Sequence, residues 1–239
     1  TEAPVTIAEY RTLRGQRLAL RLTDGTQVTL APGSVLRRSS DYGERERRLE
    51  LEGEAYFVVT HDSARPFTVH TRRLVARDLG TRFNVRAYPD EGATDVVVAE
   101  GKVAVEGPRG ARRSDTTQAG PASAELPGRR IAMLTAGQLG RMDASGEITL
   151  RSGVDLERRL AWTEGRLVFN DTPLGEVERQ LERWYDIEVR LATTNLRPLR
   201  VTGAFDDEPL TQVLEAVARS LDLIVRHTGG SYELSRKPM

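Results

Sequence analysis

The chain has 239 residues, of which 38% are hydrophobic and 29% charged, so it holds enough apolar material for one large folded domain or two smaller ones. Lysine plus arginine and aspartate plus glutamate number 35 each, and this balance argues against a protein that attracts nucleic acid or an anionic membrane through its net charge. Because the chain has no cysteine and only three histidines, the sequence excludes disulfides and thiolate metal sites, and we expect neither a metal nor another cofactor.

The sequence also lacks an apolar run of about eighteen residues, the minimum for a membrane-spanning helix. The first residues, TEAPVTIAEY, have neither the basic end nor the apolar segment of a signal peptide. We therefore expect the chain as given to be soluble. Because it begins without methionine, it is consistent with a trimmed piece of a longer protein, with any membrane anchor lost upstream.

From Leu18 to about Leu150, apolar and polar residues alternate, as in RLALRL, RRLELEGEAYFVV, GTRFNVRAY and DVVVAEGKVAV. Alternation places every second side chain on one face, which is typical of half-buried β-strands. Turn-forming pairs such as Asp24-Gly25 and Pro32-Gly33 separate the segments. We predict an N-terminal all-β domain over residues 1–155, either a sandwich or solenoid-like, and the sequence does not decide between the two.

The regular pattern is interrupted over residues 106–130, which read EGPRGARRSDTTQAGPASAELPGRR. This composition has too few apolar side chains to offset the entropy lost on ordering. We predict a mobile loop there. Its arginines are interpreted as solvated rather than as a site for an acidic partner; they are Arg109, Arg112, Arg113, Arg129 and Arg130.

After Ser152 the period changes and a repeat appears. The stretch FNDTPLGEVERQLERWYDIEVRL (169–191) returns as FDDEPLTQVLEAVARSLDLIVRH (205–227), a constant 36 positions later. Each copy has an apolar stripe at helical spacing between two alternating segments, which predicts strand, helix, strand. Neither helix can bury its stripe alone, so we expect both copies to share one sheet in a C-terminal domain over residues 160–239. The predicted fold class is therefore α+β, with two domains.

The two predicted helices begin in the same way. Pro173 and Pro209 stand where the missing N–H of a first helical residue costs nothing. Thr172 in the first copy, and Asp207 or Glu208 in the second, are expected to cap the helix through their side chains. The carboxylate run from Asp206 to Glu208 is therefore interpreted as part of a cap rather than as a Ca²⁺ or acid–base site.

Candidate catalytic groups are few. His61, Asp62, Ser63 and His70 are types that could form a nucleophile and base, but neighbours in a strand point apart and no G-x-S-x-G turn is present. The chain also lacks the glycine motifs that cradle phosphates. We interpret these residues as structural and predict that the protein is not an enzyme.

A protein-binding role fits the repeat better. A small sheet leaves edge strands with unpaired N–H and C=O groups, which an extended partner segment can satisfy. The preferred edge is RVTGAF, which has little bulk at Thr202 and Gly203 and no proline; it consists of Arg200, Val201, Thr202, Gly203, Ala204 and Phe205. Trp184 and Tyr185, whose equivalents in the second copy are Ser220 and Leu221, are the runner-up contact as an aromatic anchor present only once. The position of Trp184 continues the apolar stripe of its helix, however, which favours a core role for this residue.

The chain resembles the FecR-type sigma regulators, the inner-membrane partners of extracytoplasmic-function sigma factors. The resemblance covers almost the whole chain, and its specificity comes from the order and spacing of several motifs. These are LTDGTQVTLAPGSVL (22–36), RRLELEGEAYFVV (47–59), RPFTVHT (65–71), LGTRFNVRAY (79–88), VVVAEGKVAV (96–105), LTAGQLGRMD (134–143) and AWTEGRLVFNDTPLGEV (161–177). The C-terminal repeat is similar to the small STN domain, which secretins and TonB-dependent transducers share.

This resemblance implies a periplasmic sensing segment without catalytic residues. Its expected partner is the N-terminal signalling domain of an outer-membrane TonB-dependent transducer, commonly one loaded with a ferric siderophore, which would connect the protein to the regulation of iron uptake. In such proteins a sigma-binding cytoplasmic domain and one transmembrane helix precede this region. The sigma factor and the membrane would thus be contacted only through parts missing here, and proteolysis would release the cytoplasmic part.

Two alternatives remain open on the sequence. A secretin-like envelope assembly module would share the C-terminal repeat, and upstream sequence would distinguish it from a sigma regulator. The other alternative is a glycan-binding or hydrolytic β-domain. Glycan binding would predict an exposed aromatic platform, and aromatic residues form only 5% of the chain.

Overall fold

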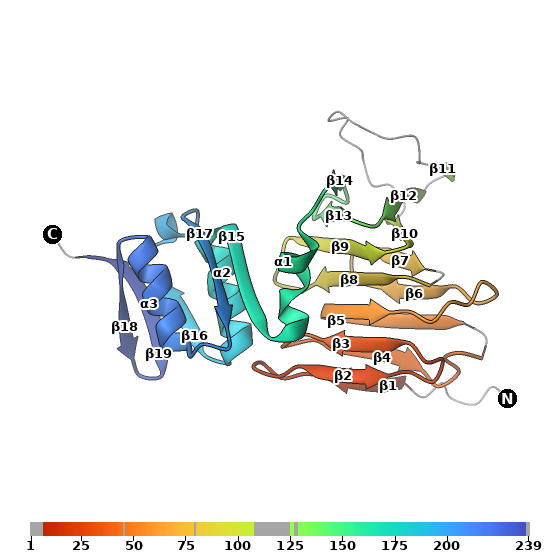
Figure 1. Ribbon diagram of the computed structural model, residues 1–239, viewed down its shortest axis with the longest axis horizontal. Helices are drawn as coiled ribbons and strands as arrows, with labels where there is room; N and C mark the ends of the chain where they lie inside the picture. Colours follow the sequence, from red (N-terminus) through yellow and green to blue (C-terminus); the bar gives the residue numbers. More distant parts are fainter. Residues whose placement is uncertain (1–6, 45, 79, 108–124, 127–128, 238–239) are drawn as a thin grey trace. The chain divides into compact units, whose positions relative to one another are not determined.

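The structure, a computed structural model shown in Figure 1, describes residues 7–44, 46–78, 80–107, 125–126 and 129–237. The chain divides into two compact units. The first consists of Thr1–Thr12 and Arg17–Leu156, and the second of Leu13–Gln16 and Glu157–Met239. Each unit has its own hydrophobic core.

The described part of the first unit is built from strands. They are β1 (Ile7–Arg11), β2 (Leu18–Arg21), β3 (Gln27–Leu30), β4 (Val35–Ser39), β5 (Arg47–Val58), β6 (Phe67–His70), β7 (Val75–Asp78), β8 (Arg82–Ala87), β9 (Ala93–Glu100), β10 (Lys102–Glu106), β11 (Glu125–Leu126), β12 (Arg129–Thr135), β13 (Gln138–Asp143) and β14 (Ile148–Ser152). The alternation read from the sequence thus predicts strands correctly over most of this region.

The long strand β5 joins two runs of strands into one nearly closed sheet (Figure 1). Its first half pairs with β4 and β6, and its second half, from Gly53, pairs with β3 and β8. Gly53 has φ 105° at this change of partners, and an added Cβ would lie 2.4 Å from the hydroxyl of Ser34. Only glycine combines that backbone conformation with so close an approach.

Apolar side chains from both runs of strands fill the interior of the first unit. Phe57, Phe67 and Phe83 are fully buried there, and the rings of Phe57 and Phe83 stack with centroids 5.1 Å apart. Most of the predicted 106–130 loop lies outside the described residues. Within it, Glu125–Leu126 and the start of β12 at Arg129 are strand.

The second unit contains the helices and the repeat. Its elements are α1 (Leu156–Leu160), the 3₁₀ helix η1 (Ala161–Glu164), β15 (Arg166–Pro173), α2 (Leu174–Tyr185), β16 (Glu188–Leu191), the 3₁₀ helix η2 (Thr194–Leu196), β17 (Arg200–Asp206), α3 (Leu210–Ser220), β18 (Leu223–Thr228) and β19 (Ser231–Arg236). The prediction of strand, helix, strand in both copies is confirmed. With the first unit, these elements give the α+β class expected.

The prediction that the two copies share one sheet is wrong. β15 and β17 form a two-stranded antiparallel sheet, while β16, β19 and β18 form a separate three-stranded sheet in that order. β19, which lies outside the repeat, separates β16 from β18. The helices lie between the two sheets (Figure 1), so their apolar stripes have strands on both sides to pack against.

The prediction that side chains cap the two helices is also wrong. Pro173 and Pro209 are themselves the N-cap residues, and neither helix has a side-chain cap. At α2 the free N–H groups of Leu174 and Gly175 donate instead to the backbone carbonyls of Leu199 and Arg197, at 2.7 and 3.1 Å. Tertiary backbone contacts thus satisfy the helix start, and Asp171 and Asp207 take left-handed conformations with φ 50° and 64°.

Candidate partner-binding surface

The outer edge of β17 is the edge that the sequence favours as a docking strand. In the described residues β17 pairs only with β15. The carbonyl of Leu199 accepts from Leu174 N–H, so it faces the β15 side. Since the direction of the backbone N–H and C=O groups alternates along a strand, these groups point toward β15 at Val201, Gly203 and Phe205. At Arg200, Thr202 and Ala204 they point outward.

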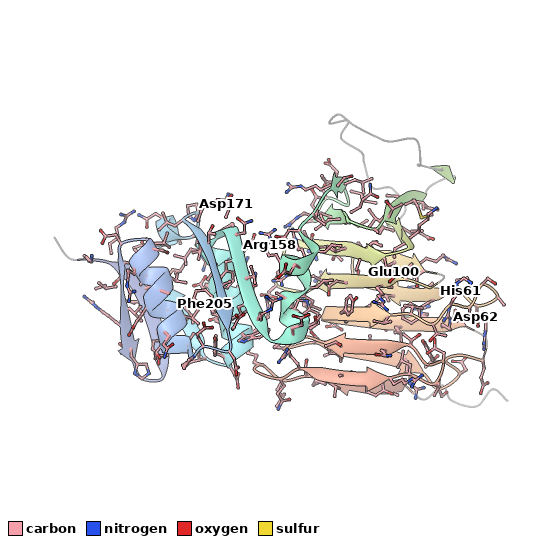
Figure 2. The ribbon with its side chains drawn as sticks, viewed as in Figure 1. His61, Asp62, Glu100, Arg158, Asp171 and Phe205 are labelled. Atoms are coloured by element: carbon pink, nitrogen blue, oxygen red, sulfur yellow. The ribbon has the colours of Figure 1, made fainter. Side chains whose placement is uncertain are left out.

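The side chains of this strand follow the same alternation. Arg200, Thr202 and Ala204 are exposed, whereas Val201 is 2% exposed and lies in the core. Phe205 packs against that core, with its ring centroid 6.0 Å from that of Phe169. A Cβ added at Gly203 would lie 3.3 Å from the Phe205 ring, so the missing side chain makes room for this phenylalanine. Figure 2 labels Phe205 and Asp171 on the two paired strands.

Two polar contacts tie β17 to β15. Arg200 Nη1 donates to the Asp171 carbonyl at 2.9 Å, and Asp171 N–H donates to the Thr202 hydroxyl at 3.0 Å. Both hold the bulge where the register of the pair shifts between Phe169 and Thr172. The exposed Ala204 side chain makes no such polar contact and therefore offers the cleanest place to probe the outer edge.

Trp184 and Tyr185 make contacts within the second unit. Both are partly buried and pack against its core. The Tyr185 hydroxyl donates to the carbonyl of Glu208 at 2.6 Å, which ties the end of α2 to the segment before α3. Burial raises the pKa of Tyr185 above its ordinary value. These contacts agree with the core role that the helix stripe favours for Trp184, and they give Tyr185 a structural role that sequence reasoning did not assign.

The outer edge of β16 carries a feature that sequence reasoning missed. Val189 N–H and Leu191 N–H donate to carboxylate oxygens of Glu182 and Glu178 on α2, at 3.2 and 3.3 Å. The second Glu178 oxygen lies 3.1 Å from Arg197 Nη1. Helix side chains thus occupy the donors that another strand would need. A signal was available, because the repeat replaces these two glutamates with Leu214 and Ala218.

Two family models match the chain. The model described as FecR protein matches residues 8–104, and that described as FecR, C-terminal, matches residues 166–233. The chain belongs to the FecR family of sigma regulators. Apart from Leu13–Gln16, the first match falls in the first compact unit, and the second match falls in the second unit.

Solved structures agree with this assignment. A 1.65 Å crystal structure of a candidate anti-sigma factor from Parabacteroides distasonis ATCC 8503 is similar to the FecR chain with 29% identity and a TM-score of 0.82. It covers 97% of this chain and 100% of that one. A 2.50 Å structure described in the same words gives 29% identity, a TM-score of 0.82 and coverage of 98% and 100%. No curated protein is similar enough to count as a match.

The candidate catalytic residues of this FecR chain do not assemble into a nucleophile and base. The Asp62 carboxylate accepts from Arg65 Nε at 2.9 Å and from the N–H groups of Ala64 and Arg65. These bonds outweigh the opposing effect of burial and hold the pKa of Asp62 below its ordinary value. Figure 2 labels His61 and Asp62 in the segment that follows β5.

His70 lies elsewhere, on β6, lining a hollow with Arg48, Arg73 and Arg77. Burial, and then the charge of Arg48, lower its pKa. Among the residues that the structure describes, no group of three or more His, Cys, Asp or Glu side chains is placed to hold a metal ion. No helix in the same part of the chain is long and apolar enough to cross a membrane.

Proposed function

We propose that this chain is the periplasmic, signal-receiving region of a membrane-anchored FecR-type sigma regulator. It binds the N-terminal signalling domain of an outer-membrane TonB-dependent transducer and so controls an extracytoplasmic-function sigma factor. The signal is a ferric siderophore at the transducer, and the protein works by binding and not by catalysis. The sigma factor is contacted by a cytoplasmic domain of the full-length protein.

The open outer edge of β17 is the observation that carries the docking proposal. Its outward N–H and C=O groups belong to Arg200, Thr202 and Ala204, whose side chains are exposed. No proline interrupts the strand. A transducer segment that adds as a strand would satisfy these groups, and the short side chain of Ala204 leaves room for its backbone. In this proposal the second unit, whose repeat is similar to the STN domain, is the strand acceptor.

Trp184 and Tyr185 are secondary contacts in this proposal. Their partial exposure leaves some surface for a partner, but most of each ring serves the core and the Tyr185 hydroxyl is already bonded. We therefore place the main binding energy at the β17 edge and expect the two aromatic residues to adjust it.

Proline substitution tests the edge directly. Ala204→Pro removes an outward N–H and leaves the β15 ladder intact, so binding of an isolated transducer signalling domain should weaken at least tenfold in a titration, equivalent to about 1.4 kcal/mol. Val225→Pro on β18 is the matched control and should bind like the native chain. Unchanged affinity for Ala204→Pro, with the second unit folded, would contradict docking at β17.

A further inference from the structure

The three-stranded sheet of the second unit ends in two different edges. At the β16 edge, Glu178 and Glu182 hold the outward N–H groups. The other edge is β18, and the repeat places Leu214 and Ala218 of α3 where those glutamates would stand. Apolar side chains cannot accept a hydrogen bond, so α3 lacks the groups that block the first edge.

Burial differs between the two edges in the same direction. Val189 on β16 is 2% exposed, whereas its counterpart Val225 on β18 is partly exposed. The neighbouring His227 is exposed. No residue in the described part of the chain bonds to the backbone N–H of Val225 or His227 on this side of the strand. The β18 edge is thus the more open of the two.

The ladder identifies which β18 groups point outward. The Leu234 carbonyl accepts from Ala192 N–H at 3.0 Å, so it faces the β16 side of β19. Its opposite residue on β18, Val225, is therefore in a pair without mutual hydrogen bonds. Val225 turns its N–H and C=O away from β19, and by alternation so do Leu223 and His227.

We propose that β18 pairs antiparallel with β18 of a second copy of this chain. Centring the pair on Val225 places Val225 opposite itself, and Leu223 opposite His227 of the second copy. The outward N–H and C=O groups of all three residues then form hydrogen bonds with the second copy across the axis. The proposal is independent of transducer binding, which uses the β17 edge.

The side chains of β18 suit this self-pairing. Arg226 is the only charged residue of the strand with histidine neutral, and the register sets it opposite Ile224 of the second copy. The two arginines therefore do not lie directly opposite each other, an arrangement of like charges that would destabilise the pair. The two Val225 side chains lie side by side on the face that packs toward the core.

The blocked edge sets the size of the assembly. Joining two three-stranded sheets through β18 leaves β16 at both ends of a six-stranded sheet. Each β16 edge carries the Glu178 and Glu182 carboxylates, so further strand addition is prevented. An isologous pair with closed ends forms a dimer rather than a filament.

Sedimentation of the full chain tests the dimer. Because few residues make the contact, we expect weak association, with the average mass rising from 26.5 kDa toward twice that value as concentration approaches about 1 mM. Val225→Pro should stay at the monomer mass, while Ala204→Pro should associate like the native chain. A native chain that remains monomeric throughout this range overturns the proposal.

Cross-linking tests the register without relying on a proline. The chain has no cysteine, so Val225→Cys introduces a single thiol at the axis, where paired Cα atoms lie about 5.5 Å apart and a disulfide can form. Thr228→Cys is the matched control, because its two copies would be separated by about 20 Å. Under mild oxidation we expect a covalent dimer for the first variant and little for the second. Equal cross-linking of both variants, or of neither, rejects this register.

Transducer binding distinguishes the self-pairing from the other use of this edge. If Val225→Pro weakens transducer binding while the native chain stays monomeric, the β18 edge serves the transducer and the self-pairing is wrong.

Discussion

Val168 and Ala204, which are 36 residues apart and occupy equivalent positions in the repeat, lie directly opposite each other in the pairing of β15 with β17. Two antiparallel strands that meet at equivalent residues are related by a local two-fold axis. The next equivalent pair, Phe169 and Phe205, therefore packs ring against ring, with centroids 6.0 Å apart. The sequence repeat is thus a symmetry element of the second unit and has an architectural meaning.

The helix stripes give the first prediction. Leu181 on α2 is fully buried, and Val217 at the matching position of α3 is 1% exposed. Leu181→Ala should lower the free energy of unfolding of the second unit by about 2–5 kcal/mol, because a cavity remains where the side chain was. Val217→Ala should cause a smaller loss, since it removes fewer atoms.

Tryptophan fluorescence measures this loss selectively, because both tryptophans of the chain, Trp162 and Trp184, belong to the second unit. Gln212→Ala, on the exposed side of α3, is the control and should leave the transition almost unchanged. Near-zero shifts for both core variants would show that the stripes do not carry the packing of this unit.

The repeat explains why so much of the second unit can be predicted from the sequence, and also where prediction stops. Period and spacing identify the strands, the helices and their buried stripes, because these depend on local alternation. The separation into two sheets depends on β19, which has no counterpart in the repeat. Likewise, the carbonyls of Arg197 and Leu199 that satisfy the start of α2 come from a distant segment.

The four aspartates with left-handed backbone show the same division. Asp171 and Asp207, and Asp186 and Asp222, have φ between 50° and 64° and form two pairs 36 residues apart. Their recurrence is visible in the sequence. The reason for their recurrence is not visible there, because aspartate is common both as a helix-capping residue and at positions with positive φ. Only the backbone conformation distinguishes the two roles.

The second prediction concerns Arg47, whose guanidinium is 1% exposed inside the first unit. It donates to Asp24 Oδ2 at 3.2 Å and to the carbonyls of Thr60 and Arg65, each at 2.7 Å. Arg47→Met should lower the free energy of unfolding of the first unit by about 3–5 kcal/mol, because it leaves the buried Asp24 carboxylate without its cation.

The adjacent Arg48 provides the control for this prediction. Its partner Glu50 lies 2.9 Å away, and both side chains are about half exposed. Arg48→Met should cost no more than about 1 kcal/mol. Circular dichroism would follow the mostly β first unit, and the tryptophan signal should not move in either variant. Similar small losses for both substitutions would mean that the Arg47 contacts contribute little to stability.

The third prediction is a pH dependence at the blocked β16 edge. Burial raises the pKa of Glu178 above its ordinary value of 4.5, against the opposing charge of Arg197. A carboxyl group whose pKa is raised by folding contributes stability that is complete below the unfolded pKa and is lost as pH rises through the folded pKa. Glu178→Gln removes this titration and keeps an oxygen for Leu191 N–H. The variant should therefore gain in free energy of unfolding relative to the native chain as pH rises above 4.5.

Urea unfolding followed by tryptophan fluorescence between about pH 4 and 7 measures the difference, with the exposed Glu188→Gln as the control. A difference that is constant across this range, or that changes in the opposite direction, would show that the folded environment does not disfavour the Glu178 carboxylate.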